Sequence, residues 1–216
     1  MKLIIRAFPI VFLFLLALAT VPRAQAQSFS VSFGAGAATD KACVRPADCL
    51  DQQDINNPAQ LDNAPKMTGA FGKIGADFMF TGHLGFGFQA DWKFSQGDYF
   101  GFGYRPEFFD LNAIYHPIPD KLTRGRVVPE IQVGLGAARV NSYLTGSTAL
   151  TGTQSELFAI SSHFLVHGGF GVKLYVKGGI FIKPQVDARY VVNFTQFGSD
   201  FVPEYSVSLG YTFGRR

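Results

Sequence analysis

The chain is poor in charged residues and lacks a second long apolar run. Charged side chains make up 16% of its 216 residues, whereas roughly 25% is usual in soluble domains, and aromatic residues reach 15%. After the N-terminal segment no apolar run is long enough for a transmembrane helix. Phosphate loops, nucleotide fingerprints and zinc motifs are also absent. A charge-poor, aromatic-rich chain without spanning helices favours a closed barrel in a membrane.

The first 26 residues have the pattern of a secretory signal peptide. Lys2 and Arg6 lead into the apolar stretch 7–19, and Ala24-Gln25-Ala26 follows as a small-residue cleavage site. We therefore predict a signal peptide over 1–26 and one domain over 27–216; an uncleaved membrane anchor is the alternative. Without Lys2, Arg6 and Arg23 the chain keeps 16 basic residues against its 16 acidic ones. The apparent basicity therefore gives no reason to expect a nucleic-acid partner.

Apolar and polar residues alternate strictly along LGFGFQADWKF (84–94). Leu84, Phe86, Phe88 and Trp92 share one face with Ala90 and Phe94, and the intervening residues are polar or glycine. This period of two predicts a strand with one apolar and one polar face. The pattern recurs in eight segments: 27–37, 68–80, 84–94, 105–116, 127–140, 163–175, 180–194 and 204–213. Several reach the length of about 9–11 residues that a bilayer-crossing strand needs.

Even strand number, strand length and alternation together predict an all-β protein, an eight-stranded antiparallel transmembrane β-barrel with up-and-down meander topology. The connections after 68–80 and 163–175 are tight, and those spanning roughly 38–66 and 141–162 are long. With a periplasmic N-terminus, the long connections would be extracellular loops.

The polar faces decide which side of each strand points inward. They carry many glycines. In a narrow lumen small residues would make room for long side chains from the opposite wall, whereas a solvent-exposed sheet surface has no need of them. We predict a charge-balanced lumen network of ten residues: Lys73, Asp77, Asp91, Lys93, Asp110, Glu130, Lys173, Lys183, Asp187 and Arg189. Equal numbers of each sign would let every buried charge find a partner.

Aromatic residues are expected in two interfacial girdles. The loop-side set is Trp92, Phe94, Tyr104, Tyr190 and Tyr205, and the turn-side set is Phe29, Phe80, Tyr115, Tyr211 and Phe213. The alternative is a lipocalin-like soluble barrel with these aromatics in its core. Such a barrel is expected to carry a Gly-x-Trp near its mature start and a helix near its end, and the sequence has neither.

The last strand, YSVSLGYTF, alternates Tyr205, Val207, Leu209 and Tyr211 up to the aromatic Phe213. With this motif and the strand pattern, 27–216 resembles the OmpA/OmpX-like eight-stranded outer-membrane barrels of Gram-negative-type bacteria. The resemblance implies an outer-membrane location after Sec-type export, contact with outer-membrane lipid and lipopolysaccharide, and recognition of Tyr205–Phe213 by the barrel-assembly machinery. It also implies a monomer. The chain departs from the family in adding Gly214-Arg215-Arg216, and it lacks a peptidoglycan-binding domain.

Few residues suggest chemistry, and we predict no catalytic, cofactor or metal site. Cys43 and Cys49 have five residues between them in the first long connection, and in an oxidising compartment they would form a disulfide. His163 and His167 share a strand face, but a spacing of about 13 Å is too wide for one ion. The stretch SELFAISSHF offers Glu156, Ser161, Ser162 and His163, the residue types of an acyl hydrolase.

Three functions remain from the sequence. The first is a structural or surface-interaction barrel, and we prefer it because an eight-stranded interior is filled by side chains. The second is a small OmpW-like channel or binder for a small hydrophobic solute. The third is a lipid A-modifying acyl hydrolase or transferase.

Overall fold

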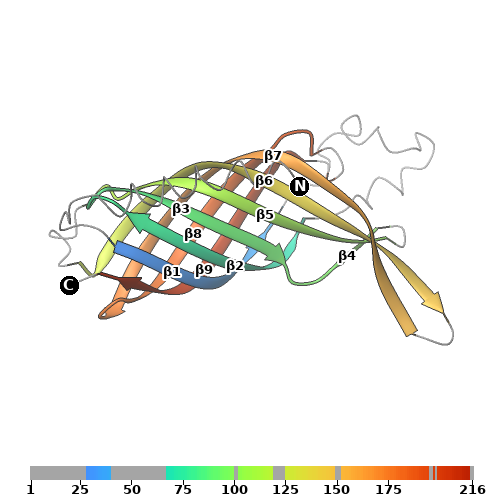
Figure 1. Ribbon diagram of the computed structural model, residues 1–216, viewed down its shortest axis with the longest axis horizontal. Helices are drawn as coiled ribbons and strands as arrows, with labels where there is room; N and C mark the ends of the chain where they lie inside the picture. Colours follow the sequence, from blue (N-terminus) through green and yellow to red (C-terminus); the bar gives the residue numbers. More distant parts are fainter. Residues whose placement is uncertain are drawn as a thin grey trace, which may run out of the picture.

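Strands account for nearly all of the part of the chain that the computed structural model describes, which comprises residues 28–39, 67–99, 102–118, 125–148, 152–194, 197 and 199–214 (Figure 1). They are β1 (Ser28–Ala38), β2 (Gly69–Met79), β3 (Leu84–Lys93), β4 (Gly97–Tyr99), β5 (Phe102–Tyr115), β6 (Val127–Thr148), β7 (Gly152–Lys177), β8 (Ile180–Val191) and β9 (Phe201–Phe213). The predicted signal peptide and both cysteines lie outside the described residues, so these two predictions stay predictions. No helix among the described residues is long and apolar enough to cross a membrane.

The sheet closes on itself. Its order is β3-β2-β1-β9-β8-β7-β6-β5, and a further β3–β5 ladder joins the two ends. Every ladder is antiparallel, and β1 pairs with β9 from Phe29↔Phe213 to Ala38↔Glu204. The short β4 pairs only with the start of β5 and is not part of the ring. The predicted eight-stranded up-and-down barrel is therefore confirmed.

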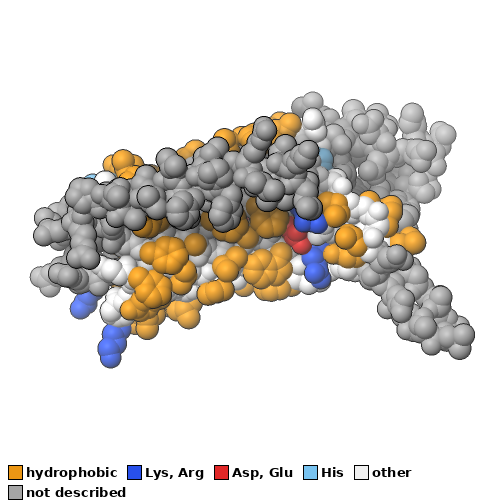
Figure 2. Space-filling model, viewed as in Figure 1, with side chains coloured by type: hydrophobic (Ala, Val, Ile, Leu, Met, Phe, Trp, Pro, Cys, Tyr) orange, Lys and Arg blue, Asp and Glu red, His pale blue; other side chains and the backbone are white. Residues whose placement is uncertain are grey.

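The alternation in the sequence becomes an inside and an outside. Apolar side chains stand exposed on the outer surface of seven strands, and on β2 the outward-facing Ile74 and Phe78 are half-buried; Figure 2 shows part of this hydrophobic band. Members of this band include Phe33, Phe86, Phe88, Leu111, Val133, Leu135, Phe170, Val186, Val207 and Leu209. Soluble monomers rarely expose a contiguous apolar patch of more than a few hundred Å². The hydrocarbon interior of a bilayer is therefore a more suitable environment for this surface than water. We call it the apolar belt.

One predicted loop is wrong, because 141–162 is largely strand. The ladder between β6 and β7 extends from Val127↔Leu174 to Thr148↔Gly152, with one register shift between Ser142 and Tyr143. The neighbours end earlier: β5 reaches only Leu144 of β6, and β8 reaches only Leu165 of β7. The two strands therefore project past the barrel as a two-stranded ribbon (Figure 1). We call the described residues of this part, 143–148 and 152–157, the β6–β7 hairpin.

A bulge explains why the alternation missed this hairpin. The register shifts between Ser142 and Tyr143, so that Ser142 faces Ala159 whereas Tyr143 faces Leu157. The extra residue, Phe158, reverses which side chains point to each face and interrupts the period of two. The hairpin is also rich in Gly, Ser and Thr, as many loops are. Its two strands nevertheless pair, because they are held by backbone groups rather than by these side chains.

Strand ends differ from the prediction at three further places. The segment expected to begin at 105 begins at Phe102, the one expected to end at 194 ends at Val191, and the last strand begins at Phe201 rather than 204. The last difference matters for the lumen, because it carries Glu204 fully into the barrel wall.

Gly178 occupies the first position of the two-residue turn between β7 and β8, since Lys177 pairs with Ile180. Its φ is 57°, a left-handed conformation that costs an L-residue roughly 1–2 kcal/mol. We expect Gly178→Ala to lower the free energy of unfolding by about 1 kcal/mol, measured by urea titration of the refolded barrel. Gly168→Ala is the matched control: open space surrounds either added Cβ, but only Gly178 has a left-handed φ. Equal losses at the two positions would contradict the backbone explanation.

Candidate functional site

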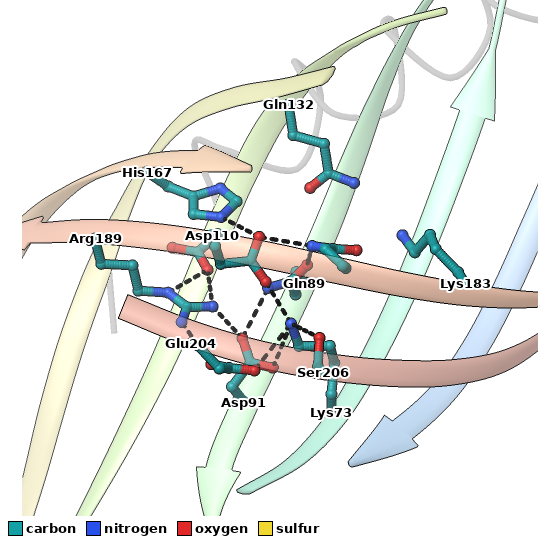
Figure 3. Close-up of polar contacts among 12 residues, drawn as sticks. Lys73, Gln89, Asp91, Asp110, Gln132, His167, Lys183, Arg189, Glu204 and Ser206 are labelled. Atoms are coloured by element: carbon teal, nitrogen blue, oxygen red, sulfur yellow. Dashed lines mark hydrogen bonds and ion pairs between the residues drawn. The ribbon is translucent and has the colours of Figure 1, made fainter. Parts of the chain in front are cut away.

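The middle of the barrel interior is filled by charged side chains in direct contact. Arg189 on β8 is fully buried, and its guanidinium reaches three carboxylates from three other strands (Figure 3). Nε and Nη2 donate to Asp110 Oδ2 at 3.0 and 2.9 Å, and Nη1 donates to Glu204 Oε2 at 2.7 Å. Nη2 also contacts Asp91. The guanidinium lies 4.7 Å from the centroid of the Phe108 ring.

Lys73 on β2 contacts two of the same carboxylates and adds a fourth, Asp187. Its Nζ lies 2.6 Å from Asp187 Oδ2, 3.0 Å from Glu204 Oε1 and 3.6 Å from Asp91 Oδ1. It also donates to Ser206 Oγ at 2.9 Å. Because Lys73 and Arg189 share Asp91 and Glu204, they form one network across the lumen.

A second set of charges lies around Glu130 on β6. Its carboxylate accepts Lys173 at 2.8 Å, Lys183 at 3.3 Å and His116 at 3.2 Å. Lys173 Nζ also donates to Asp77 Oδ2 at 2.8 Å, which ties β7 to β2.

Neutral polar side chains connect the two sets. His167 contacts Asn112 Oδ1 at 2.7 Å through Nδ1 and Asp187 Oδ1 at 2.9 Å through Nε2. Asn112 Nδ2 donates to Gln132 Oε1 at 3.3 Å, and Gln132 Nε2 donates to Glu130 Oε1 at 2.5 Å, which completes the link to the second set. Gln185 donates to Gln89 Oε1 at 2.9 Å and to Asp187 Oδ1 at 2.7 Å. The interior therefore holds a polar network in which most members contact several others, an arrangement that satisfies buried polar groups.

Glycine in the wall gives these side chains room. A Cβ built on Gly87 would lie 2.8 Å from Asp77 Oδ1 and 2.8 Å from Ile114 Cδ1, closer than real Cβ atoms approach. The small residue at this position is therefore a consequence of the charged chain that crosses in front of it.

All ten residues proposed for the lumen network are buried. Nine of them make the ion pairs described above; the tenth, Lys93, has its Nζ 5.1 Å from the centroid of the Tyr104 ring. Sequence reasoning missed Glu204 and His116. Glu204 could have been found from the sequence, because it shares its strand face with Ser206. It was overlooked because it is the first residue of the predicted segment. Its inclusion gives six carboxylates against five Lys and Arg in the interior.

The loop-side end of the interior is apolar, which corrects the expectation of a polar lumen throughout. A cluster of buried side chains fills it: Ala38, Met67, Phe71, Tyr104, Phe108, Ala138, Val140, Leu165, Val191, Phe194, Phe197 and Val202. Phe71 and Phe108 stack with centroids 6.0 Å apart, and Phe194 and Phe197 stack at 4.6 Å. We call these residues the apolar cluster.

Tyr104 was wrongly placed in the loop-side girdle. It is buried in the apolar cluster, edge-on to Phe197 at 5.5 Å, because even-numbered residues of β5 point inward. The other girdle residues, except the partly buried Trp92, are exposed on the outer surface: Phe94, Tyr190, Tyr205, Phe29, Phe80, Tyr115, Tyr211 and Phe213.

Two of the residues considered for acyl hydrolysis, Ser162 and His163, lie on opposite faces of β7. Ser162 is exposed on the outer face, whereas the ring of the adjacent His163 packs edge-on against the buried Phe194 at 5.3 Å. Ser161 shares the inward parity of His163, so neither side chain belongs to the outer, lipid-facing surface of β7. The side chain of Glu156 is not among those described. Within the described ranges, no group of three or more His, Cys, Asp or Glu residues could hold a metal ion.

Comparison with known proteins identifies the fold. No protein-family model matches the chain, and no curated protein matches its sequence. A major outer membrane protein from Thermus thermophilus has a similar structure, with a TM-score of 0.58, 12% identity, and coverage of 87% of this chain and 100% of that chain. Neisserial surface protein A gives a TM-score of 0.52 at 14% identity, covering 85% of this chain and 95% of that one. Outer membrane protein OprG from Pseudomonas aeruginosa gives 0.50 at 11% identity, covering 87% and 96%. The chain thus has the fold of small outer-membrane β-barrels.

Proposed function

We propose that this chain is an integral protein of a bacterial outer membrane whose closed barrel is a rigid, non-conducting scaffold. Its role is structural and interactive: the barrel holds the β6–β7 hairpin beyond the membrane surface, where it contacts partners. In this proposal the final strand, β9, is the segment that the barrel-assembly machinery recognises, and the protein is a monomer.

The filled interior carries the proposal. An eight-stranded barrel is just wide enough for side chains to fill its interior. Here the apolar cluster occupies the loop-side end, and the ion pairs of Arg189 and Lys73 occupy the middle. Toward the turn side, Thr212 Oγ1 lies 2.9 Å from both Ser30 Oγ and Tyr175 Oη. Side chains that occupy all three levels of the axis support an interior without a continuous water-filled path.

The β6–β7 hairpin supports the interactive part of the proposal. It continues past the ends of its neighbours β5 and β8, so its outer part lacks the shielding that the barrel gives other strands. Leu144 and Leu157 in the hairpin and Phe158 and Ile160 beside it are exposed. Exposed apolar side chains on a ribbon that projects from a scaffold are typical of a contact surface.

The geometry around His163 favours a non-enzymatic role. A lipid A deacylase needs a nucleophile, a base and a carboxylate that converge at the outer surface. In this barrel Ser162 and His163 belong to opposite faces of β7, and the histidine ring packs in the interior.

Planar-bilayer recording tests the closed scaffold. We expect the refolded protein to insert without steady unitary conductance, because the interior is filled by paired charges and apolar side chains. Insertion is checked in parallel by the folded, heat-sensitive band on an unboiled gel. Reproducible unitary steps from fully folded protein would contradict the proposal.

The apolar cluster favours one alternative, a binder or channel for a small hydrophobic solute. Its twelve residues lie at the loop-side end, where such a solute would enter. This alternative requires saturable binding of an apolar fluorophore that Phe71→Arg abolishes, whereas the closed scaffold binds none.

A further inference from the structure

The outer surface carries a group of charged residues beside the loop-side end of the apolar belt. Odd-numbered residues of β5 and β6 point outward in this region, so Arg105, Glu107 and Arg139 share the outer face with the exposed Phe109. Figure 2 shows basic atoms beside acidic ones at the loop-side margin of the hydrophobic band. We call these three residues the Arg105–Arg139 patch.

Strand register brings the two arginines together. Glu107 pairs with Arg139, and Arg105 pairs with Asn141. Arg105 and Arg139 are therefore diagonal neighbours on one face of adjacent strands, a separation of about 7–8 Å that long side chains easily bridge. Two guanidinium groups and one carboxylate give the patch a net positive charge.

The patch has unused hydrogen-bonding capacity. All ion pairs among the described residues lie in the interior, and none includes Arg105, Glu107 or Arg139. Arg105 Nε is buried without a hydrogen-bond partner among the described atoms. Arg139 Nε donates to Asn141 Oδ1 at 3.0 Å, which fixes its guanidinium and leaves the terminal nitrogens for another acceptor.

The surroundings match the depth of a lipid headgroup. One step toward the membrane, Phe109 pairs with Ala137 and Ala137 pairs with Phe164, and all three are exposed on the apolar belt. Trp92 pairs with Glu107 and packs edge-on against Phe94 at 6.4 Å. Tryptophan beside charged residues at the end of an apolar band marks the membrane–water interface.

We infer that the Arg105–Arg139 patch binds a phosphate group of lipid A, the phosphorylated glycolipid anchor of lipopolysaccharide in the outer leaflet. Arginine presents a planar donor fork that matches phosphate oxygens, and such charge-assisted bonds are strong at a membrane surface. The acyl chains would then lie against Phe109, Ala137 and Phe164. The inference rests on the proposed function, since it requires the barrel in an outer membrane with the β6–β7 hairpin outside.

Trp92 is a built-in reporter for this binding, because the chain has a single tryptophan and it adjoins the patch. Protein refolded in zwitterionic detergent micelles is titrated with dansyl-labelled bisphosphorylated lipid A, and energy transfer from Trp92 gives the Kd. We expect Arg105→Gln with Arg139→Gln to raise the Kd about tenfold or more, since two charged hydrogen-bonding groups are lost. Glu107→Gln should lower the Kd, because it removes the one negative charge.

Two controls separate a specific site from general attraction. Arg126→Gln with Lys177→Gln removes the same charge from exposed residues at the turn side and should leave the Kd unchanged. Dephosphorylated lipid A should bind wild type and the Arg105→Gln, Arg139→Gln variant equally. An unchanged Kd in that variant, or an equal loss in the turn-side control, would overturn the inference. Each single variant should give an intermediate Kd, which keeps the test valid if the double variant folds poorly.

The outcomes also distinguish this inference from the function on which it rests. Protein that folds into lipid vesicles but binds lipid A independently of Arg105 and Arg139 overturns the patch and leaves the outer-membrane scaffold intact. Protein that never inserts into vesicles overturns the proposed function itself.

Discussion

Replacing Arg189 by Met is expected to destabilise the barrel by about 3–5 kcal/mol or to prevent its assembly. The guanidinium contacts Asp91, Asp110 and Glu204, and all four side chains are almost completely buried. Met fills a similar volume but leaves three buried carboxylates with only Lys73 as a nearby cation. Most of the lost stability comes from carboxylates that stay buried without a countercharge.

The measurement is urea unfolding of protein refolded in vesicles, followed by Trp92 fluorescence and by gel mobility without boiling. Arg126→Met, at an exposed position, is the control and should change the free energy of unfolding by less than about 0.5 kcal/mol. If Arg189→Met does not fold, adding Asp110→Asn and Glu204→Gln should restore folding by removing two of the stranded charges. A loss below about 1 kcal/mol for Arg189→Met alone would contradict the central role of this side chain.

Leu111→Arg is expected to cost about 2–4 kcal/mol in a bilayer, even though Leu111 is 67% exposed in the isolated chain. Leu111 lies within the apolar belt, between Phe88 on β3 and Leu135 on β6. In water an exposed Leu tolerates Arg with little effect. In hydrocarbon the guanidinium loses its hydration and has no partner on the belt.

Leu144→Arg provides the matched control. Leu144 is also exposed, but it lies in the β6–β7 hairpin, at the last residue of β6 that pairs with β5. The same substitution there should change stability by less than about 0.5 kcal/mol. Equal effects at Leu111 and Leu144 would contradict the assignment of the belt to the membrane.

The sequence was sufficient to predict the barrel, because strand alternation is set by burial. One residue out of phase moves a whole strand face from lipid to lumen, so the register of segments such as 84–94 is strongly specified. The same parity placed Lys73, Asp91 and Arg189 on the inner face, and all three side chains are buried. It would also place Glu204 there, because Glu204 is the first residue of the predicted segment 204–213 and shares the parity of Ser206 and Ser208.

Other features depend on position along the barrel axis, which alternation does not report. Phe71 and Phe108 interrupt polar faces in the sequence, and only the three-dimensional register shows that they meet Phe194 and Phe197 at one end. Tyr104 was assigned by its chemical type rather than its parity. The bulge after Ser142 reverses the faces of the β6–β7 hairpin, so its pairing could be found only from the backbone.

The long-range pairing of the interior charges also constrains how the barrel can enter a membrane. Lys73 on β2 makes its shortest contact with Asp187, 114 residues later, and Lys173 on β7 reaches back 96 residues to Asp77. A hairpin that crossed the bilayer alone would carry these charges into hydrocarbon without their countercharges. Ring closure at the β1–β9 seam completes the backbone pairing and brings the remaining opposite charges together. Insertion and closure are therefore coupled steps, with partly inserted intermediates disfavoured by the same charges that later hold the wall together.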